Sequence, residues 1–233
     1  IWGRRAAVAE RVPRIFHVEH NTRERYTARR LKQAQDLMPY TEACIGVSEG
    51  VRTSLIERGF NPAKCIAIPN GIDLERFPES ILNPWDKREP AIMMASRFAR
   101  QKDHSTLIRA MALLKERGFT PRLYLAGGGK QRLKKKVQAL VAQLNLQNQI
   151  QFLGNVSDLP ECLGKLQIFV LSTHWEGMPL ALVEGMAAGC ACVVSDVVGA
   201  REVVTSNVTG LKVPENDVEA MAAALLNLLT TPE

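Results

Sequence analysis

The sequence predicts a parallel α/β fold in which one complete domain follows part of a second. Short apolar segments of strand length alternate with amphipathic helical segments, an order typical of parallel sheets covered by helices on both faces. The chain has 233 residues, of which 46% are hydrophobic and 23% charged, and this composition supports a sizeable core. The alternation stops once, between residues 74 and 90, where periodicity disappears and three prolines occur.

The first 73 residues are expected to be the C-terminal part of a domain. The predicted strands and helices cover residues 14–18, 23–37, 43–47, 49–58 and 65–68. Ser48 is suited to cap the second helix and Gly59 to end it. Because the sequence opens in what reads as the middle of a domain, we expect residues before Ile1. Apolar side chains should then lack some of their partners at four positions: Ile15, Phe16, Ile45 and Val47.

Residues 91–233 are expected to form a complete Rossmann-like domain, with residues 74–90 as the linker before it. Five strands are predicted, at residues 91–95, 122–126, 150–153, 168–172 and 191–195. Five helices are predicted, at residues 103–117, 130–144, 159–163, 179–188 and 218–229. Such a unit presents its ligand site at the carboxyl ends of the strands.

The net charge of +6 and the pI near 9.2 favour anionic partners, such as a nucleotide diphosphate or an acidic lipid surface. Aromatic residues are only 6% and do not interleave with the basic ones, so nucleic acid is not expected as a partner. The lysines at 134–136 are expected on the solvated side of a helix. No run of about 18 apolar residues predicts a membrane span. Five cysteines without a C-x-x-C pair indicate buried free thiols in a cytoplasmic protein.

Two glutamates seven residues apart surround a helix start after a buried strand. Glu176 precedes the helix and Glu184 lies in its second turn. Pro179 suits the first helical position, and free amides at the start of a helix bind anions. The residues expected around such an anion are Gly177, Met178, Pro179 and Leu180. The alternative is structural, with one acid beside a helix end and the other paired to a surface base.

Two cations lie in the loop after the first strand of the second domain. Arg97 can bind two phosphate oxygens at once, and Lys102 adds a compact charge at the start of the next helix. Fixed cations would stabilise the negative charge on a departing diphosphate. The chain has no D-x-D sequence, so no metal site and no metal-diphosphate clamp are expected. The glycines at 127–129 do not form G-x-G-x-x-G, because Arg132 replaces the third glycine, so no nicotinamide cofactor is expected.

The chain resembles glycosyltransferase family 4, whose fold is the two-domain GT-B type. The resemblance covers nearly the whole chain and depends on the order and spacing of several short motifs. They are V-S at 47–48, I-P-N-G-I-D at 68–73, S-R-F-A-R-Q-K-D at 96–103, A-G-G-G at 126–129, F-L-G-N-V at 152–156 and the E-x7-E element at 176–184. Two departures are Met178, where the family often has an aromatic residue, and Gly129, where an acid often precedes glycine.

The resemblance implies a role for each motif. Glu184 would hold the ribose hydroxyls and Glu176 the transferred sugar, while the metal-independent pair Arg97 and Lys102 would bind the diphosphate. Two further sets are implied: Gly154 and Asn155 beside the nucleobase, and His20 facing the donor sugar from the first domain. His17 is the competing choice for that last role, and a purely structural histidine is the other alternative.

We therefore expect a retaining glycosyltransferase that moves a hexosyl unit from a nucleotide sugar, uridine-linked, to a hydroxyl acceptor. The acceptor is expected to be a lipid-linked glycan or a polysaccharide intermediate, with the cytoplasmic enzyme peripheral at the inner membrane face. The alternatives are another GT-B enzyme, such as a nucleotide-sugar epimerase, or a donor-binding module without activity. The 233 residues alone are expected to bind nucleotide but not to transfer sugar.

Overall fold

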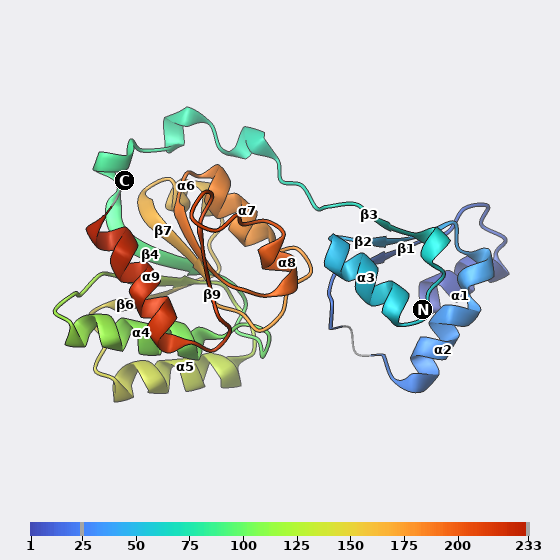
Figure 1. Cartoon of the computed structure of the whole chain (residues 1–233), viewed down its shortest axis with the longest axis horizontal. Coiled ribbons are helices and arrows are strands. Elements are labelled where there is room, and N and C mark those ends of the chain that lie inside the picture. Colours follow the sequence, from blue (N-terminus) through green and yellow to red (C-terminus); the bar gives the residue numbers. More distant parts are fainter. Residues whose placement is uncertain (24–25, 232–233) are drawn as a thin grey trace. The chain divides into compact units, whose positions relative to one another are not determined.

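The computed structural model describes residues 1–23 and 26–231. Their contacts divide the chain into two compact units. The first contains Ile1–Gly71 together with Trp175–Met178, and the second contains Ile72–His174 and Pro179–Glu233. Both are built from parallel strands that alternate with helices (Figure 1).

The first unit has a three-stranded parallel sheet in the order β1-β2-β3. Its strands are β1 (Phe16–Glu19), β2 (Ala43–Gly46) and β3 (Cys65–Ala67). Its helices are α1 (Trp2–Ala9), α2 (Ala28–Asp36), α3 (Glu49–Glu57) and the short 3-10 turns η1 (Met38–Tyr40) and η2 (Pro62–Lys64). The helix α1 has no counterpart among the predicted elements.

The predicted cap of α3 is confirmed, because Ser48 Oγ accepts a hydrogen bond from the amide of Val51 at 3.2 Å. Gly59 follows the helix with φ +79°, a conformation that favours glycine. The helix α2 starts later than predicted. Thr27 caps it by accepting from the amide of Arg30, and part of the predicted first turn, residues 24–25, lies outside the described residues.

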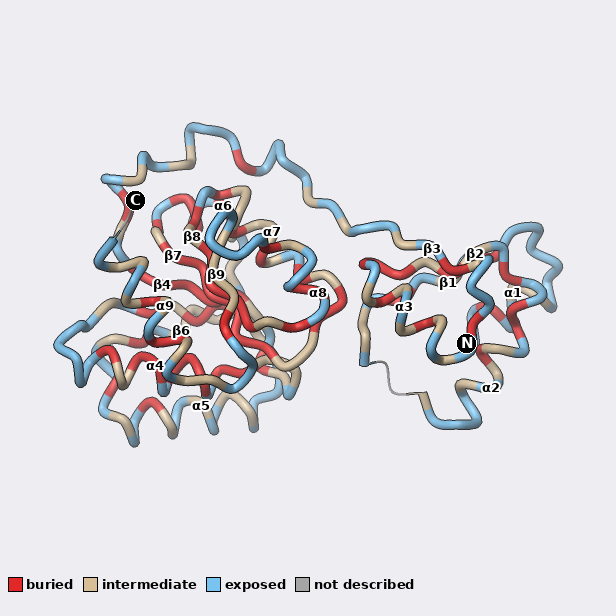
Figure 2. The backbone as a smooth tube through the Cα atoms, viewed as in Figure 1, coloured by how far each residue is buried: buried red, intermediate tan, exposed pale blue. Residues whose placement is uncertain are grey.

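One face of this small sheet carries exposed apolar side chains. Phe16 and Val18 alternate with the more buried His17 and Glu19 along β1, as the period of a strand requires. The exposed fractions on the open face are substantial: Phe16 50%, Val18 44%, Ile66 42% and Ile68 50%. Among the apolar positions that we expect to lack packing partners, Phe16 is exposed, whereas Ile15 and Val47 are buried. Figure 2 shows where the exposed segments lie.

The second unit has a six-stranded parallel sheet in the order β6-β5-β4-β7-β8-β9. Its strands are β4 (Glu89–Ala95), β5 (Leu123–Ala126), β6 (Ile150–Gly154), β7 (Leu166–Leu171), β8 (Ala191–Ser195) and β9 (Leu211–Val213). The strands β5 and β6 lie on one side of β4, and β7, β8 and β9 lie on the other. The order therefore reverses between β4 and β7, and this topological switch point is where doubly wound folds bind ligands.

Helices cover both faces of this sheet (Figure 1). One face carries α4 (His104–Glu116), α5 (Gln131–Gln143) and α9 (Val218–Thr230), and the other carries α6 (Leu159–Leu163), α7 (Leu180–Ala187) and α8 (Val198–Arg201). Ile92 and Met93, adjacent on β4 and almost fully buried, belong to the two opposite core clusters. Burial on both faces explains why these strands are continuous apolar runs.

The segment before β4 packs on the second unit. It contains three 3-10 turns, η3 (Leu74–Arg76), η4 (Glu79–Ile81) and η5 (Trp85–Lys87). Phe77 is buried in the same cluster as Leu182 of α7. Arg88 donates hydrogen bonds to the carbonyls of Ala188 (2.8 Å) and Gly189 (3.0 Å), just after α7. The second unit therefore begins at Ile72, earlier than the sequence-based boundary at residue 91.

Candidate functional site

The loops that follow β4 and β7 meet at the switch point of the second unit. Lys102 and Thr173 form an isolated antiparallel bridge. The amide of His174 donates to the carbonyl of Gln101 at 2.8 Å, and Thr173 Oγ1 donates to the same carbonyl at 3.0 Å. These bonds fix the backbone of Lys102 at the edge of the sheet where ligands are expected.

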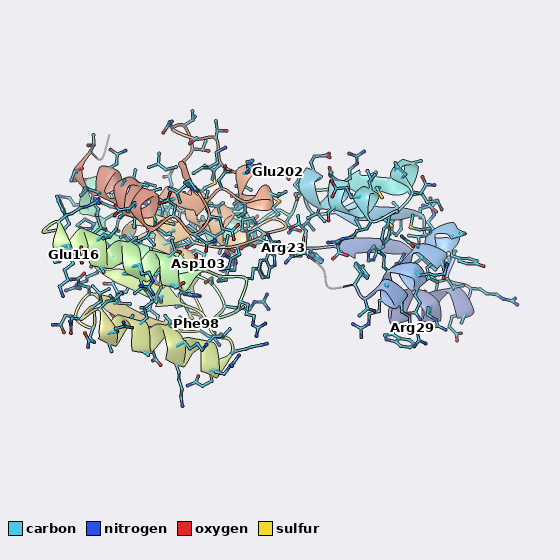
Figure 3. The ribbon with its side chains drawn as sticks, turned by 60° about the horizontal axis from the view of Figure 1, so that its bottom comes forward. Arg23, Arg29, Phe98, Asp103, Glu116 and Glu202 are labelled. Atoms are coloured by element: carbon cyan, nitrogen blue, oxygen red, sulfur yellow. The ribbon has the colours of Figure 1, made fainter. Side chains whose placement is uncertain are left out.

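Two helices, α4 and α7, begin at this edge, and the start of α4 is closed by its own cap. Asp103, labelled in Figure 3, is 4% exposed. Its carboxylate accepts hydrogen bonds from the amide of Thr106 at 3.1 Å and from Ser105 Oγ at 2.7 Å. Burial raises the pKa of Asp103, but these hydrogen bonds outweigh burial and the net pKa is lowered. A negative charge of the protein's own therefore occupies this helix start, which disfavours a second anion there.

The start of α7 has no side-chain cap. Pro179 is the N-cap residue in an extended conformation (φ −79°, ψ 102°), so the helix begins at Leu180 and not, as predicted, at the proline. The amides of Leu182 and Val183 donate to the carbonyl of Pro179, and Leu180 is 43% exposed. An uncapped helix start attracts an anion through its amides and dipole.

Glu184 lies one turn further along α7. Its side chain is 16% exposed, and its Oε1 atom lies 3.4 Å from Nη1 of Arg76. The structure therefore brings the uncapped helix start and this acid together on one short helix.

Arg97 and Lys102 both lie in the loop after β4, as predicted; Arg97 is exposed and Lys102 half-buried. The glycine segment 127–129 supports that loop. The amide of Phe98 donates to the carbonyl of Gly128 at 2.7 Å, and a β-carbon at Gly127 would collide with the carbonyl of Ser96. Gly127 also has φ +126°, so two independent requirements select glycine there.

A buried histidine that no sequence motif indicates packs against this loop. His104 is 4% exposed, stacks on Phe98 with ring centroids 4.6 Å apart, and places Nε2 at 3.3 Å from Ser96 Oγ. Burial lowers the pKa of His104 to about 4, so the ring is neutral at pH 7. Lys134 Nζ lies 5.9 Å from the Phe98 ring and 6.0 Å from that of Phe152. That side chain is therefore half-buried against aromatic rings, which corrects the prediction that it faces solvent.

Gly154 and Asn155 lie directly beside the glycine segment. The amide of Gly127 donates to the carbonyl of Gly154 at 2.6 Å. A β-carbon at Gly128 would lie 2.7 Å from Oδ1 of Asn155. The ends of β4, β5 and β6 thus bring the predicted nucleobase residues to the loop that carries Arg97.

The remaining predicted residues belong to the first unit, because Trp175–Met178 groups with it. Glu176 is 5% exposed, and its carbonyl accepts a hydrogen bond from Thr22 Oγ1 at 3.3 Å. Gly177 packs so closely on the carbonyl of His20 that a β-carbon would collide with it.

The two candidate histidines of the first unit have different surroundings. His20 is exposed and follows β1 directly. His17 stacks on Phe60 with ring centroids 5.9 Å apart, and its Nε2 lies 3.6 Å from Glu19 Oε2. These contacts hold the His17 ring against residues of its own unit.

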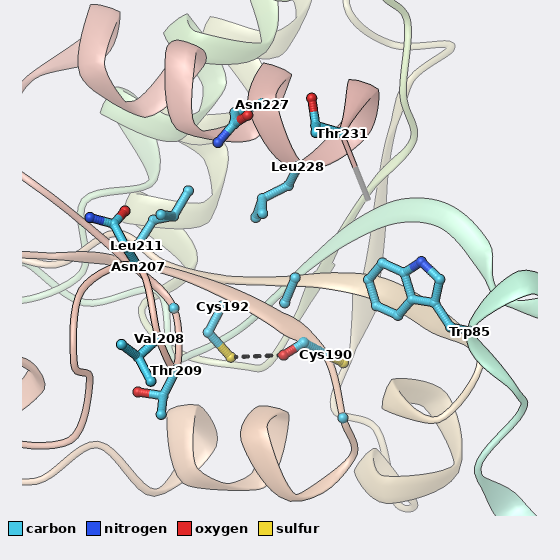
Figure 4. A pocket seen from close by; sticks show the side chains of 13 residues that line it. Trp85, Cys190, Cys192, Asn207, Val208, Thr209, Leu211, Asn227, Leu228 and Thr231 are labelled. Carbon is cyan, nitrogen blue, oxygen red and sulfur yellow. Dashed lines mark hydrogen bonds between the residues drawn. The ribbon is translucent and has the colours of Figure 1, made fainter. Parts of the chain in front are cut away.

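A separate pocket of about 530 Å³ lies where β8 and β9 begin (Figure 4). It is lined by Trp85, residues 189–192, residues 207–211, Asn227, Leu228 and Thr231. These residues include no charged side chain, and the pocket is at the amino ends of the strands rather than at the switch point. It therefore does not fit a nucleotide diphosphate.

Among residues 1–23 and 26–231, no helix has the length and apolar character needed to span a bilayer. The same described residues contain no cluster of three or more His, Cys, Asp or Glu side chains suited to a metal ion.

The sequence matches two family models over adjoining regions. The model of glycosyl transferases group 1 matches residues 78–233, and that of glycosyltransferase family 4 matches residues 1–76. The UDP-Gal:alpha-D-GlcNAc-diphosphoundecaprenol alpha-1,3-galactosyltransferase of Escherichia coli is 29% identical over 178 residues, which are 72% of this chain and 46% of that protein.

A relative in Campylobacter jejuni is 30% identical over 195 residues, 83% of this chain and 52% of that protein. It is N-acetylgalactosamine-N,N'-diacetylbacillosaminyl-diphospho-undecaprenol 4-alpha-N-acetylgalactosaminyltransferase. The chain thus spans about half the length of these relatives.

Among solved structures, that of HepE from Anabaena in complex with UDP and glucose matches with a TM-score of 0.88 and 21% identity, over 99% of this chain and 65% of that one. This likeness confirms the predicted GT-B type of α/β fold.

Proposed function

We infer the function from one premise: this chain belongs to the family of group 1 glycosyl transferases. We propose that the protein transfers a hexosyl unit from a nucleotide sugar to a hydroxyl acceptor with retention of configuration. One observation carries the proposal for this chain. Of the two helices that start at the switch point, α4 is closed by Asp103 while α7 is uncapped. The diphosphate of the donor would therefore lie at α7, with Glu184 within reach of the adjoining ribose.

The proposed chemistry needs positive charge where the leaving group develops negative charge. As the bond between the anomeric carbon and the diphosphate oxygen breaks, the electron pair moves to the diphosphate. Arg97 and Lys102, in the loop after β4, would stabilise that charge more strongly in the transition state than in the ground state. The acceptor oxygen would form the new bond, and the departing diphosphate would take its proton. We propose no protein nucleophile, no metal ion and no further cofactor.

The remaining residues would select the donor. We propose that Gly154 and Asn155 line the nucleobase subsite, that Glu176 and the adjacent Gly177 and Met178 contact the sugar, and that His20 faces the sugar from the first unit. His20 suits this role better than His17, because its side chain is exposed while His17 is packed on Phe60.

The acceptor is proposed to be a lipid-linked glycan or a polysaccharide intermediate. The Escherichia coli and Campylobacter jejuni relatives are both named for a sugar linked to diphosphoundecaprenol. Most of the net positive charge of this sequence falls within its first 71 residues, which favours a peripheral contact with an anionic membrane surface. Flotation of the protein with vesicles containing phosphatidylglycerol, at low and high salt, would test that contact.

Calorimetric titration would test the assignment of the donor site. We expect UDP to bind the wild-type chain more tightly than GDP or ADP. Glu184→Ala should weaken binding of UDP itself, because it removes acceptors for the ribose hydroxyls. Glu176→Ala should leave UDP binding unchanged and reduce the gain in affinity from UDP to a UDP-sugar. If both variants bind both ligands like the wild type, the proposed site is wrong.

A further inference from the structure

The glutamate assigned to the ribose has a charged partner outside α7. Arg76 Nη1 lies 3.4 Å from Oε1 of Glu184, and the two side chains are 49% and 16% exposed. A pair exposed to this extent contributes little to folding stability. Its main consequence is therefore local, because it restricts the orientation of the Glu184 carboxylate.

The fold holds Arg76 in this place. The next residue, Phe77, is 8% exposed and belongs to the core cluster that contains Leu182 of α7. The preceding turn is closed by Asp73, whose Oδ1 atom accepts from the amide of Glu75 at 3.0 Å. The backbone on both sides of Arg76 is thus fixed, so the guanidinium reaches Glu184 from a defined position.

A carboxylate binds two vicinal hydroxyl groups well only when its plane is correctly oriented. An unrestrained glutamate side chain samples several rotamers and loses that freedom when a ligand binds. A guanidinium that already contacts one oxygen reduces the number of orientations that the carboxylate samples before the ligand binds, and it can do so without becoming a ligand of the nucleotide.

We propose that Arg76 is a positioning residue that orients Glu184 toward the ribose hydroxyls and so sets the preference for ribonucleotides. This inference rests on the proposed function, which places the ribose at Glu184. The competing arrangement is a direct contact between Arg76 and the phosphates, and it predicts a different pattern of binding.

The test compares UDP with 2′,3′-dideoxy-UDP, which keeps the base and phosphates but lacks both ribose hydroxyls. The measured quantity is the ratio of the dissociation constants, dideoxy-UDP over UDP, by calorimetry on the 233-residue chain. In the wild type we expect a ratio of about 10 or more, because hydrogen bonds to a charged group are lost. Arg76→Gln should lower the ratio about threefold or more, and Glu184→Gln should lower it at least as far, because its neutral amide makes weaker hydrogen bonds to the ribose hydroxyls.

The remaining variants separate positioning from other effects. In the double variant the ratio should equal that of Glu184→Gln, because Arg76 acts only through Glu184. Arg76→Lys should recover part of the ratio. Lys87→Gln removes a positive charge from the same segment, where Lys87 is 73% exposed and paired with Asp86, and should leave both dissociation constants unchanged.

Each of the remaining outcomes contradicts either the positioning role of Arg76 or the assignment of the ribose to Glu184. Equal weakening of both ligands by Arg76→Gln would assign Arg76 to the phosphates and reject the positioning role. An unchanged ratio in Arg76→Gln, with a lowered ratio in Glu184→Gln, would reject the inference and leave the proposed function standing. A ratio that does not change in Glu184→Gln would reject the ribose assignment and the inference with it.

Discussion

The backbone of Lys102 pairs with that of Thr173, and this bridge ties the loop after β4 to the loop after β7. The backbone of Lys102 is therefore held by bonds that do not involve its charged side-chain group. Substitution of the side chain removes the charge and keeps this backbone bridge, which makes the position suitable for testing the role of charge in transfer.

We expect Lys102→Ala and Arg97→Ala each to reduce turnover of the intact protein by roughly 10²-fold or more, as for the loss of a positioned electrostatic stabiliser. The measurement is the rate of sugar transfer at saturating donor in the presence of EDTA. Arg109→Ala, an exposed position on α4, is the control for the loss of one positive charge and should keep the wild-type rate. An absolute requirement for a divalent ion would contradict the proposed mechanism.

The glycine segment gives a second prediction, which concerns stability. Gly127→Ala introduces a β-carbon that collides with the carbonyl of Ser96, at a residue with φ +126°. Gly118 also has a positive φ, +85°, but open space around its β-carbon position. Gly118→Ala therefore reports the backbone strain alone, about 1 kcal/mol.

We expect Gly127→Ala to lower the free energy of unfolding by at least about 2 kcal/mol more than Gly118→Ala, because a steric clash is added to the strain. Urea denaturation of both variants measures the difference. Equal losses in the two variants would show that the loop after β4 moves aside at little cost.

Parts of this site could be predicted because the information is local in sequence. The alternation of strands and helices predicts a parallel sheet, and Arg97 and Lys102 were identified from their place after its first strand. The cap at Asp103 was missed, although an Asp immediately before an apolar helical run is a recognised start signal.

Other features could not be predicted because they depend on contacts between distant residues. Arg76 and Glu184 are 108 residues apart, and no local pattern indicates their pairing. His104 stacks on Phe98, and Phe98 in turn lies against Phe152 of β6, with ring centroids 6.1 Å apart, although these two rings are far apart in sequence. The strand β9 is only three residues long and contains Lys212, so its periodicity is too short to detect.

The buried His104 gives a prediction about pH. The unfolded chain takes up a proton on this histidine as the pH falls below 6.5, whereas the folded protein resists protonation until about pH 4. The contribution of neutral His104 to the free energy of unfolding is therefore fully present above pH 6.5 and is lost as the pH falls from 6.5 to about 4. One proton that binds the unfolded chain but not the folded protein lowers the free energy of unfolding by about 1.4 kcal/mol per pH unit.

We expect the wild type to lose about 2 kcal/mol more than His104→Gln when urea denaturation is compared at pH 7 and pH 5. Glutamine retains a hydrogen-bonding partner for Ser96 but does not titrate. The lowered pKa of Asp103 affects stability only below its ordinary value of 3.8, which lies outside this range. The same pH dependence in both proteins would mean that His104 is accessible to solvent in the folded state.

The last prediction concerns where the second unit begins. The sequence places the boundary at residue 91, but Phe77 is buried in the core of that unit and Arg88 binds the carbonyls that follow α7. A fragment that starts at Ile72 should therefore fold cooperatively, and a fragment that starts at residue 91 should be less stable. Burial of a phenylalanine side chain alone contributes about 1.5–3 kcal/mol, and the lost hydrogen bonds of Arg88 add to the difference.

Chemical denaturation of fragments 72–233 and 91–233 would measure this difference directly. Phe77→Ala in the longer fragment should reproduce most of it, because that substitution removes the buried ring and leaves the rest of the segment in place. Leu74→Ala is the matched control, since Leu74 lies in the same segment but is 69% exposed, and it should change the stability by less than about 0.5 kcal/mol. Equal stability of the two fragments would mean that residues 72–90 contribute nothing to the core. The boundary at residue 91 would then be the correct one, and the fixed position that we infer for Arg76 would lose its support.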